Sequence, residues 1–250
     1  MFSFRAHDLV LWHSRGVPAP SLRARVRAEL LAEIKAAARR RLTIDGPGLT
    51  LRAVARDLEM VPSALYRYFD GRDALLTALI TEAYDELGAA AEAAEAAVAP
   101  SDLRGRWMAL CRAVRRWALD HPAEFALLYG TPVPGYTAPA DTTPPAARVV
   151  VALVRLLAEA EAAGTIGAAV DRPVGPALHA DLDRIVAEAP GSPADVRPTD
   201  RVLLAGLAAW SQLFGLVGFE VFGRLADMFE DPAGHFDHQM QAMADLAGLP

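Results

Sequence analysis

The sequence predicts an all-α fold. Alanine is heavily used together with Leu, Arg and Glu, all of which have high helix propensity. Apolar residues recur at spacings of three and four along most of the chain, and no segment has a convincing strand pattern. Hydrophobic residues make up 53% of the 250 residues, so the chain can bury a substantial core.

Residues 1–22 are expected to form a flexible N-terminal arm. Gly16, Pro18 and Pro20 precede the first strong helical pattern. The apolar residues of this segment are interrupted by charged residues and histidines, which makes it a poor secretory signal.

Three helices are predicted within residues 23–70. Apolar residues at helical spacing indicate the first over residues 23–41, and the turn sequence DGPG stops it. Thr50 can N-cap a short helix that runs to about residue 58. Pro62 suits the first turn of another short helix over residues 62–68. We therefore expect a three-helix N-terminal domain.

Residues 71–250 are expected to form a larger helical domain. Asp70 is placed to cap a long helix that ends by Pro100. Residues 130–145, with five prolines and two glycines, are the only long irregular stretch. The remaining helices are expected at about residues 103–117, 121–128, 146–163, 173–188, 199–224 and 232–247.

Charge divides the chain at the same place. Residues 1–70 carry 12 Lys/Arg and 7 Asp/Glu, a net charge of +5, whereas the other 180 residues carry 13 and 24, a net charge of −11. A basic first part on an acidic second part suits phosphate binding at one end of the molecule, although chance asymmetry would give the same totals.

Residues 50–76 contain the most informative pattern. Two short helices keep a fixed angle only if each buries a few apolar residues, and four are available: Val54, Leu58, Leu65 and Phe69. The second short helix then presents Ser63, Tyr66 and Arg67 outward. Such donors can meet phosphates and base edges in a major groove. The alternatives are a three-helix packing unit with solvated Tyr and Arg, or a unit that no longer binds DNA.

The sequences GPGLTLRAVARDL (residues 46–58), VPSALYRYF (61–69) and DALL (73–76) resemble the N-terminal helix-turn-helix domain of the TetR family, over about residues 24–80. The resemblance implies that Thr50, Tyr66, Tyr68 and Arg72 touch phosphates and that Pro62, Ser63, Ala64 and Arg67 lie at or near the bases. The full set of expected DNA-binding residues is Thr50, Arg52, Pro62, Ser63, Ala64, Tyr66, Arg67, Tyr68 and Arg72.

Glu59 departs from the family pattern, which usually has Gly in this turn. A residue with a Cβ must tolerate the backbone angles that the turn demands, at a modest cost. An acidic side chain this close to the DNA face is also expected to weaken binding or to disfavour some DNA sequences.

The predicted helix over residues 199–224 is apolar on more than one side, and one of its stripes consists of small residues. Glycine inside a helix costs about 1 kcal/mol relative to alanine, which makes sense where another helix approaches closely. A two-fold dimer would place two recognition helices roughly 34–36 Å apart. The alternative is that both stripes are buried within one protomer. The candidate dimer residues are Leu207, Ser211, Gly215, Gly218 and Phe222.

Residues 126–136 (ALLYGTPVPGY) and 210–223 resemble the C-terminal domain of an actinobacterial-type TetR subgroup. The resemblance implies an effector pocket among the helices after residue 100 and a ligand that shifts the protein away from its DNA-competent state, with the long helix after Asp70 as the lever. Tyr129 and Tyr136 could give a polar anchor in an apolar pocket. Each candidate could instead be an ordinary core residue: Trp107, Cys111, Trp117, Phe125, Tyr129, Tyr136, Trp210 and Phe214.

No residue pattern indicates an enzyme, and we expect no catalytic residue, metal or cofactor. The nucleotide-binding, zinc-protease and serine-hydrolase motifs are absent. His179, Asp181 and Asp183 alternate and do not converge on one helix face, and His235 and His238 lack further ligands.

The chain is therefore expected to be a cytoplasmic, homodimeric repressor of a palindromic double-stranded operator, released by a small-molecule effector. The single cysteine, Cys111, fits a reducing compartment, and no 18-residue apolar run suggests a membrane partner. The alternative is a helical ligand-binding or interaction protein without DNA affinity.

Overall fold

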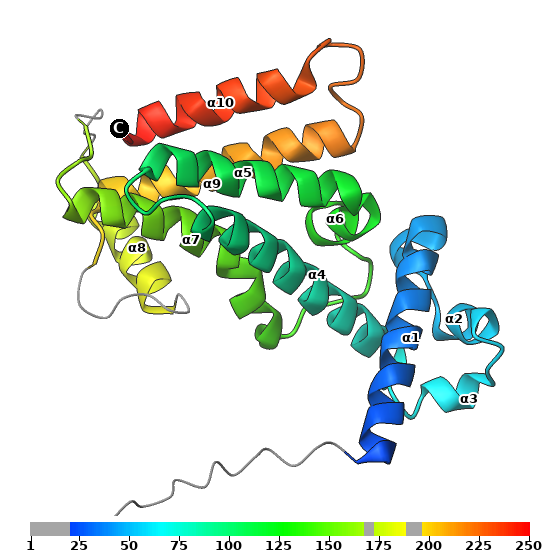
Figure 1. The fold of residues 1–250 in the computed structure, drawn as a ribbon. Coiled ribbons are helices and arrows are strands. Elements are labelled where there is room, and N and C mark those ends of the chain that lie inside the picture. The colour runs from blue at the N-terminus through cyan, green and yellow to red at the C-terminus, as the bar shows by residue number, and fades with distance from the viewer. Residues whose placement is uncertain (1–20, 168–172, 189–196) are drawn as a thin grey trace, which may run out of the picture.

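The computed structural model describes residues 21–167, 173–188 and 197–250, and this part of the chain is helical without a strand (Figure 1). The N-terminal helices are α1 (Leu22–Asp45), η1 (Gly46–Gly48), α2 (Leu51–Asp57), α3 (Pro62–Leu65) and α4 (Gly71–Ala96). The C-terminal helices are α5 (Leu103–Asp120), α6 (Pro122–Tyr129), η2 (Ala140–Thr142), α7 (Thr143–Ala162), α8 (Pro176–Glu188), α9 (Asp200–Val221) and α10 (Pro232–Ala247). The predicted all-α fold is confirmed.

Most helix ends lie within a few residues of the sequence prediction, and the differences have local causes. The expected arm falls outside the described residues except for Ser21 and Leu22, and Ser21 N-caps α1 by accepting a hydrogen bond from the Ala24 amide. Helix α3 ends at Leu65, because the chain then tightens into turns with i→i+3 hydrogen bonds such as Tyr68 N–H to the Leu65 carbonyl.

Two further differences concern helix starts. Asp70 occupies the N-cap position of α4, but its side chain accepts no hydrogen bond from the helix, so the predicted cap is positional only. Helix α8 begins at Pro176, three residues later than predicted, because proline suits a first helical turn.

The core has two parts, and α4 takes part in both. We call α1–α3 with residues 71–80 the head, and the rest of the chain from residue 81 the body. Leu75, Leu76 and Leu79 of α4 are buried in the head, whereas Ala83, Leu87 and Ala91 are buried in the body. In Figure 1, α4 leaves the head and runs into the body, where it packs between α5 and α7.

The second connection between head and body is α6. Leu127 is buried in the head core, while Phe125 on the other side of the same helix is buried in the body core. Leu128 packs against both. Residues only two positions apart therefore belong to different cores, which ties α6 to both parts.

A buried group of charges joins the far end of α4 to the body. Glu95 is only 4% exposed and accepts hydrogen bonds from Arg106 of α5 and from Arg155 of α7, the latter at 2.9 Å. Arg106 also donates to Glu159 at 2.6 Å. Because a buried carboxylate needs compensating partners, this cluster fixes the end of α4 relative to α5 and α7.

Helix α9 is the one helix in the described residues that is long and apolar enough to cross a membrane by length and composition. Half of its apolar window is buried inside the protein, and it packs on α7 and α10. That burial is the arrangement of a core helix.

Candidate nucleic-acid interface

The head core holds α2 and α3 at a fixed position on α1. Val54 of α2, Leu65 of α3 and Ile34 of α1 are fully buried in one cluster, with Phe69 beside them. Leu58, which was expected to be buried as well, is half-buried. The predicted packing of the two short helices on the first helix is thus confirmed.

Ion pairs attach the second half of α1 to its neighbours. Lys35 pairs with Glu82 of α4, and Arg39 pairs with Glu86 at 2.5 Å. Arg41 makes a two-pronged pair with Asp57 at the end of α2, and this hydrogen bonding lowers the pKa of the Asp57 carboxyl. Asp57 is therefore held ionised and compensated near neutral pH.

The turn between α2 and α3 shows how Glu59 is accommodated. The Met60 amide donates to the Ala55 carbonyl and the Glu59 amide to the Arg56 carbonyl, which is a Schellman helix end. Its left-handed position has a φ of 53° and is occupied by Glu59. Three other helices end with the same pair of bonds, and there the left-handed residue is glycine: Gly164, Gly223 and Gly248. The expected backbone demand on Glu59 is confirmed.

The predicted DNA-binding residues of α2 and α3 lie on the outside of the head. Arg52, Ser63 and Arg67 are exposed, and Tyr66 is 54% exposed. Pro62 is also exposed, while Ala64 is half-buried. Thr50 caps α2, with its hydroxyl accepting from the Ala53 amide at 3.2 Å. An exposed tyrosine beside an exposed arginine is the pair of side chains expected at a surface that binds a partner.

The side chains of Arg72 and Tyr68 make contacts within the head rather than lying free at the surface. Arg72 donates to the Leu49 carbonyl at 3.2 Å and to the Pro47 carbonyl, so it braces the loop before α2. Tyr68 is half-buried against the head core, and the Arg27 guanidinium carbon lies 4.9 Å from the centre of its ring. The sequence reasoning missed Arg27, because nothing in the spacing of α1 indicates which arginine reaches the tyrosine.

Most of the predicted effector-pocket residues lie in the body core. Trp107 is fully buried and its indole nitrogen donates to the Met240 carbonyl at 2.9 Å, so it is a satisfied core residue. Trp117 and Cys111 are also buried, and burial raises the pKa of the Cys111 thiol, which fits the expected inert cysteine.

The other pocket candidates form one aromatic cluster. The ring centres of Tyr129 and Phe214 are 4.3 Å apart, and those of Phe125 and Tyr129 are 5.1 Å apart. Trp210 lies beside Phe214, and its indole nitrogen is buried without a hydrogen-bond partner among the described residues. Burial raises the pKa of the Tyr129 phenol. Tyr84, which the sequence reasoning did not single out, joins the cluster edge-on to Tyr129.

Tyr136 approaches this cluster through Tyr84, whose pKa is raised by burial and by the nearby Tyr136 phenol. The Tyr136 hydroxyl is 2.9 Å from that of Thr77 on α4, and its ring packs against the head core. The irregular stretch that carries it crosses back to the head, and this path has no signature in a sequence rich in proline and glycine.

The small-residue stripe on α9 divides between surface and interior. Ser211 and Gly215 are exposed and Leu207 is half-buried, whereas Gly218 is buried, with room for a Cβ between Phe125 and Phe222. Gly218 therefore does not lie on the exposed face as expected. Phe219 and Phe222 are 52% and 44% exposed.

The titratable residues considered as metal ligands do not form a site. His179 is hydrogen-bonded to Asp200 at 2.7 Å and lies 3.5 Å from Asp183, whereas Asp181 pairs with Arg184. Within the described residues there is no group of three or more His, Cys, Asp or Glu side chains placed to hold a metal ion.

Comparisons with known proteins agree with this geometry. A family model described as "Bacterial regulatory proteins, tetR family" matches residues 34–79, and one described as "Tetracyclin repressor-like, C-terminal domain" matches residues 107–243. HTH-type transcriptional regulators of Mycobacterium tuberculosis and Mycobacterium bovis are 40% identical to this chain over 220 residues, which is 87% of this chain and 92% of theirs.

Solved structures share the fold of this chain. The regulatory protein SCO4313 is 37% identical with a TM-score of 0.72, covering 90% of this chain and 100% of that one. A protein with unknown function from Rhodococcus sp. RHA1 is 26% identical with a TM-score of 0.59, covering 93% of this chain and 96% of its own.

Proposed function

The chain belongs to the TetR family of transcriptional regulators, which are DNA-binding proteins rather than enzymes, and from this premise we propose that it is a cytoplasmic, homodimeric repressor that a small-molecule effector releases from a palindromic operator. The observation that carries the proposal is the exposure of Arg52 on α2, Ser63 on α3, and Tyr66 and Arg67 in the turns directly after α3, on a unit that packs on the head core.

Selection of bound sequences from a random duplex pool tests DNA binding and symmetry together. We expect an enriched palindrome with half-sites about one helical turn apart, because a two-fold dimer places two recognition helices at that spacing. Affinity should fall steeply as salt rises. Recovery of no preferred sequence, with no affinity for any duplex in dilute buffer, would leave the protein as a helical ligand-binding protein.

The exposed face of α9 supports the dimer. Ala208, Ser211 and Gly215 let another helix approach closely, and Phe219 and Phe222 extend this face with exposed apolar surface. A second copy of the same face would cover it by two-fold symmetry.

Analytical ultracentrifugation of Gly215→Arg tests the dimer. Gly215 is exposed, a Cβ there meets no atom within 4 Å, and arginine has the higher helix propensity, so the fold should be kept while the dimer dissociates. Leu178→Arg on α8, at another exposed apolar residue, is the matched control and should sediment as wild type. Equal sedimentation of both variants as dimers would place the interface elsewhere.

The aromatic cluster of Phe125, Tyr129, Trp210 and Phe214 supports an effector site in the body. Its rings offer apolar contact, the Tyr129 phenol offers a polar anchor, and the Trp210 N–H, which has no partner among the described residues, offers a hydrogen-bond donor. No member of the cluster is charged. The expected effector is therefore uncharged and largely apolar, with one acceptor for the indole.

Thermal unfolding with three naphthalene probes tests this chemistry. We expect 2-acetylnaphthalene to raise the Tm most, 2-ethylnaphthalene less, and the charged 2-naphthoate least. Trp210→Phe keeps a ring but removes the donor, so it should abolish the advantage of the ketone over the hydrocarbon. Preference for the naphthoate would contradict the expected effector class.

A further inference from the structure

The basic residues of α1 fall into two groups. In its second half, Lys35, Arg39 and Arg41 pair with carboxylates of α4 or α2, and only Arg40 has no carboxylate within 4.0 Å among the described residues. Near its start, Arg23, Arg25 and Arg27 are exposed, and none has a carboxylate within 4.0 Å among the described residues. The first turns of α1 thus carry positive charge that the described part of the protein does not compensate.

Two of these arginines lie on the side of α1 that faces the head core. Residues seven and eleven positions after Arg27 are Ile34 and Ala38, which are fully buried, and Arg23 precedes Arg27 by four positions. Spacings of four, seven and eleven keep residues on one helix face. Where α1 extends past the core, the helix face that is buried farther along therefore carries Arg23 and Arg27. Arg25, two positions before Arg27, lies on the other side of the helix.

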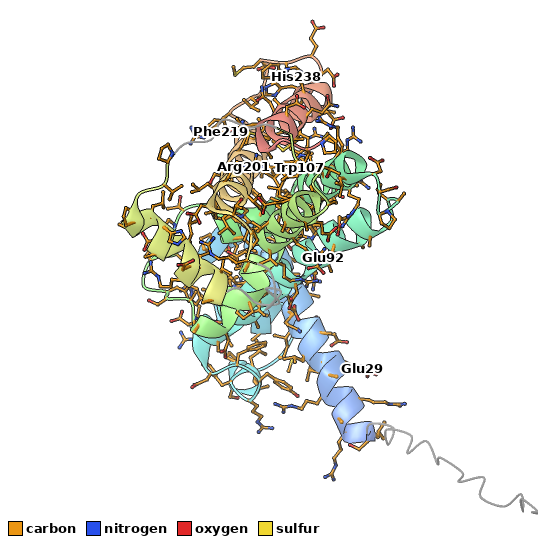
Figure 2. All side chains as sticks on the ribbon, turned by 90° about the vertical axis from the view of Figure 1, so that its left-hand side faces the viewer. Glu29, Glu92, Trp107, Arg201, Phe219 and His238 are labelled. Atoms are coloured by element: carbon orange, nitrogen blue, oxygen red, sulfur yellow. The ribbon has the colours of Figure 1, made fainter. Side chains whose placement is uncertain are left out.

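Both figures place the start of α1 and the α3 region at the end of the molecule away from α10, and Figure 2 labels Glu29 on this part of α1. Tyr68 connects the two. Its ring packs on the head core, and the Arg27 guanidinium lies over it at 4.9 Å in a cation–π arrangement. A guanidinium held over a ring by its charge still has N–H groups available as hydrogen-bond donors to another partner.

We propose that Arg27, oriented by the Tyr68 ring, binds a DNA phosphate and extends the interface from α2 and α3 onto α1. This inference rests on the proposed DNA binding. Arg27 precedes residues 34–79, which match the family model, and it is not among the residues that the family resemblance places on DNA. Tyr68 then acts as a positioning residue for Arg27, and its exposed neighbour Arg23 strengthens the local positive potential.

The test compares Arg27→Ala with Arg25→Ala in the full chain, using a 30-base-pair duplex of random sequence and the duplex recovered by selection. Both variants remove one positive charge from the same end of α1. We expect Arg27→Ala to weaken binding to both duplexes about tenfold and to reduce the slope of log K against log salt by about one, because one phosphate contact is lost. Arg25→Ala should change affinity less than about twofold.

Variants at Tyr68 test the positioning role. Tyr68→Phe keeps the ring, so Arg27→Ala should still cost about tenfold in that background. In Tyr68→Leu the ring is gone, so Arg27→Ala should cost much less. Far-UV circular dichroism and urea unfolding establish that each variant keeps its head. If Tyr68→Leu does not fold, a reduced cost of Arg27→Ala in the Tyr68→Phe background would contradict positioning by the ring.

The outcomes separate the two proposals. Equal losses for Arg27→Ala and Arg25→Ala would show a net-charge effect and overturn the inference. If the wild-type chain binds DNA and Arg27→Ala binds it with the same affinity, the inference is overturned and the repressor function is left intact. A wild-type chain without affinity for either duplex would overturn both.

Discussion

In the head, Tyr66 is half-exposed and Tyr68 carries a guanidinium on its ring, whereas in the body Trp107 and Phe125 are fully enclosed by other side chains. The same residue class thus lies at the surface in one region, where we propose that it serves recognition, and in the core in the other. An aromatic residue in a short segment that buries few side chains indicates a binding partner. An aromatic residue on a long apolar helix does not, because it can be part of the core. The head could therefore be interpreted from sequence with more certainty than the body.

The largest effect should separate the two uses of an aromatic ring. Phe125→Ala is expected to lower the free energy of unfolding by about 3–5 kcal/mol, because it opens a cavity in the body core. Tyr66→Ala should lower it by less than about 0.5 kcal/mol while weakening DNA binding. Urea denaturation and duplex titration measure both quantities. A large stability loss in Tyr66→Ala would show that Tyr66 packs in the core as Phe125 does.

Charge pairs should show the same contrast within the body. Arg106→Leu leaves Glu95 buried with Arg155 as its remaining partner and is expected to cost about 3 kcal/mol of unfolding free energy. Arg112→Leu removes a two-pronged pair with Asp237 at the surface and should cost less than about 1 kcal/mol. Similar losses of unfolding free energy for Arg106→Leu and Arg112→Leu in urea denaturation would show that the burial of Glu95 adds nothing to the cost of losing its partner.

The next prediction concerns two neighbouring residues of the head. Arg67→Ala should cost about 2 kcal/mol in discrimination between the selected duplex and a mismatched one, because a base contact is lost. Tyr66→Phe should weaken both duplexes similarly, because a phosphate contact has no sequence information. Competition titrations with both duplexes measure the ratio, and unchanged selectivity of Arg67→Ala would assign base readout to another residue.

The smallest effect is at the end of α2. Glu59→Gly should raise the free energy of unfolding by about 0.5–1 kcal/mol, because a side chain with φ of 53° is replaced by the residue that the other three Schellman ends use. Glu59→Gln removes the charge but keeps the strain, so it separates the two expected effects on DNA affinity. No stability gain in Glu59→Gly would indicate that Glu59 gains a compensating contact.

Periodicity and local turn chemistry predicted most of the fold. Thr50, Pro62 and the DGPG turn define helix ends through bonds to their own neighbours, so sequence alone identifies them. Tyr136 and Gly218 could not be placed this way. The contact of Tyr136 with Thr77 spans 59 residues, and the burial of Gly218 depends on where Phe125 of another helix lies.

The long path of α4 through both cores has a geometric consequence. With a rise of about 1.5 Å per residue, Gly71 lies roughly 36 Å along the axis from Glu95, which Arg106 and Arg155 hold. A tilt of about 5° around that fixed end would sweep Gly71 through an arc of about 3 Å. The middle of α4, roughly 18 Å from that end, would move by about 1.6 Å in the same tilt. In the proposed dimer, repacking of that size would shift each head by about 3 Å relative to the DNA grooves.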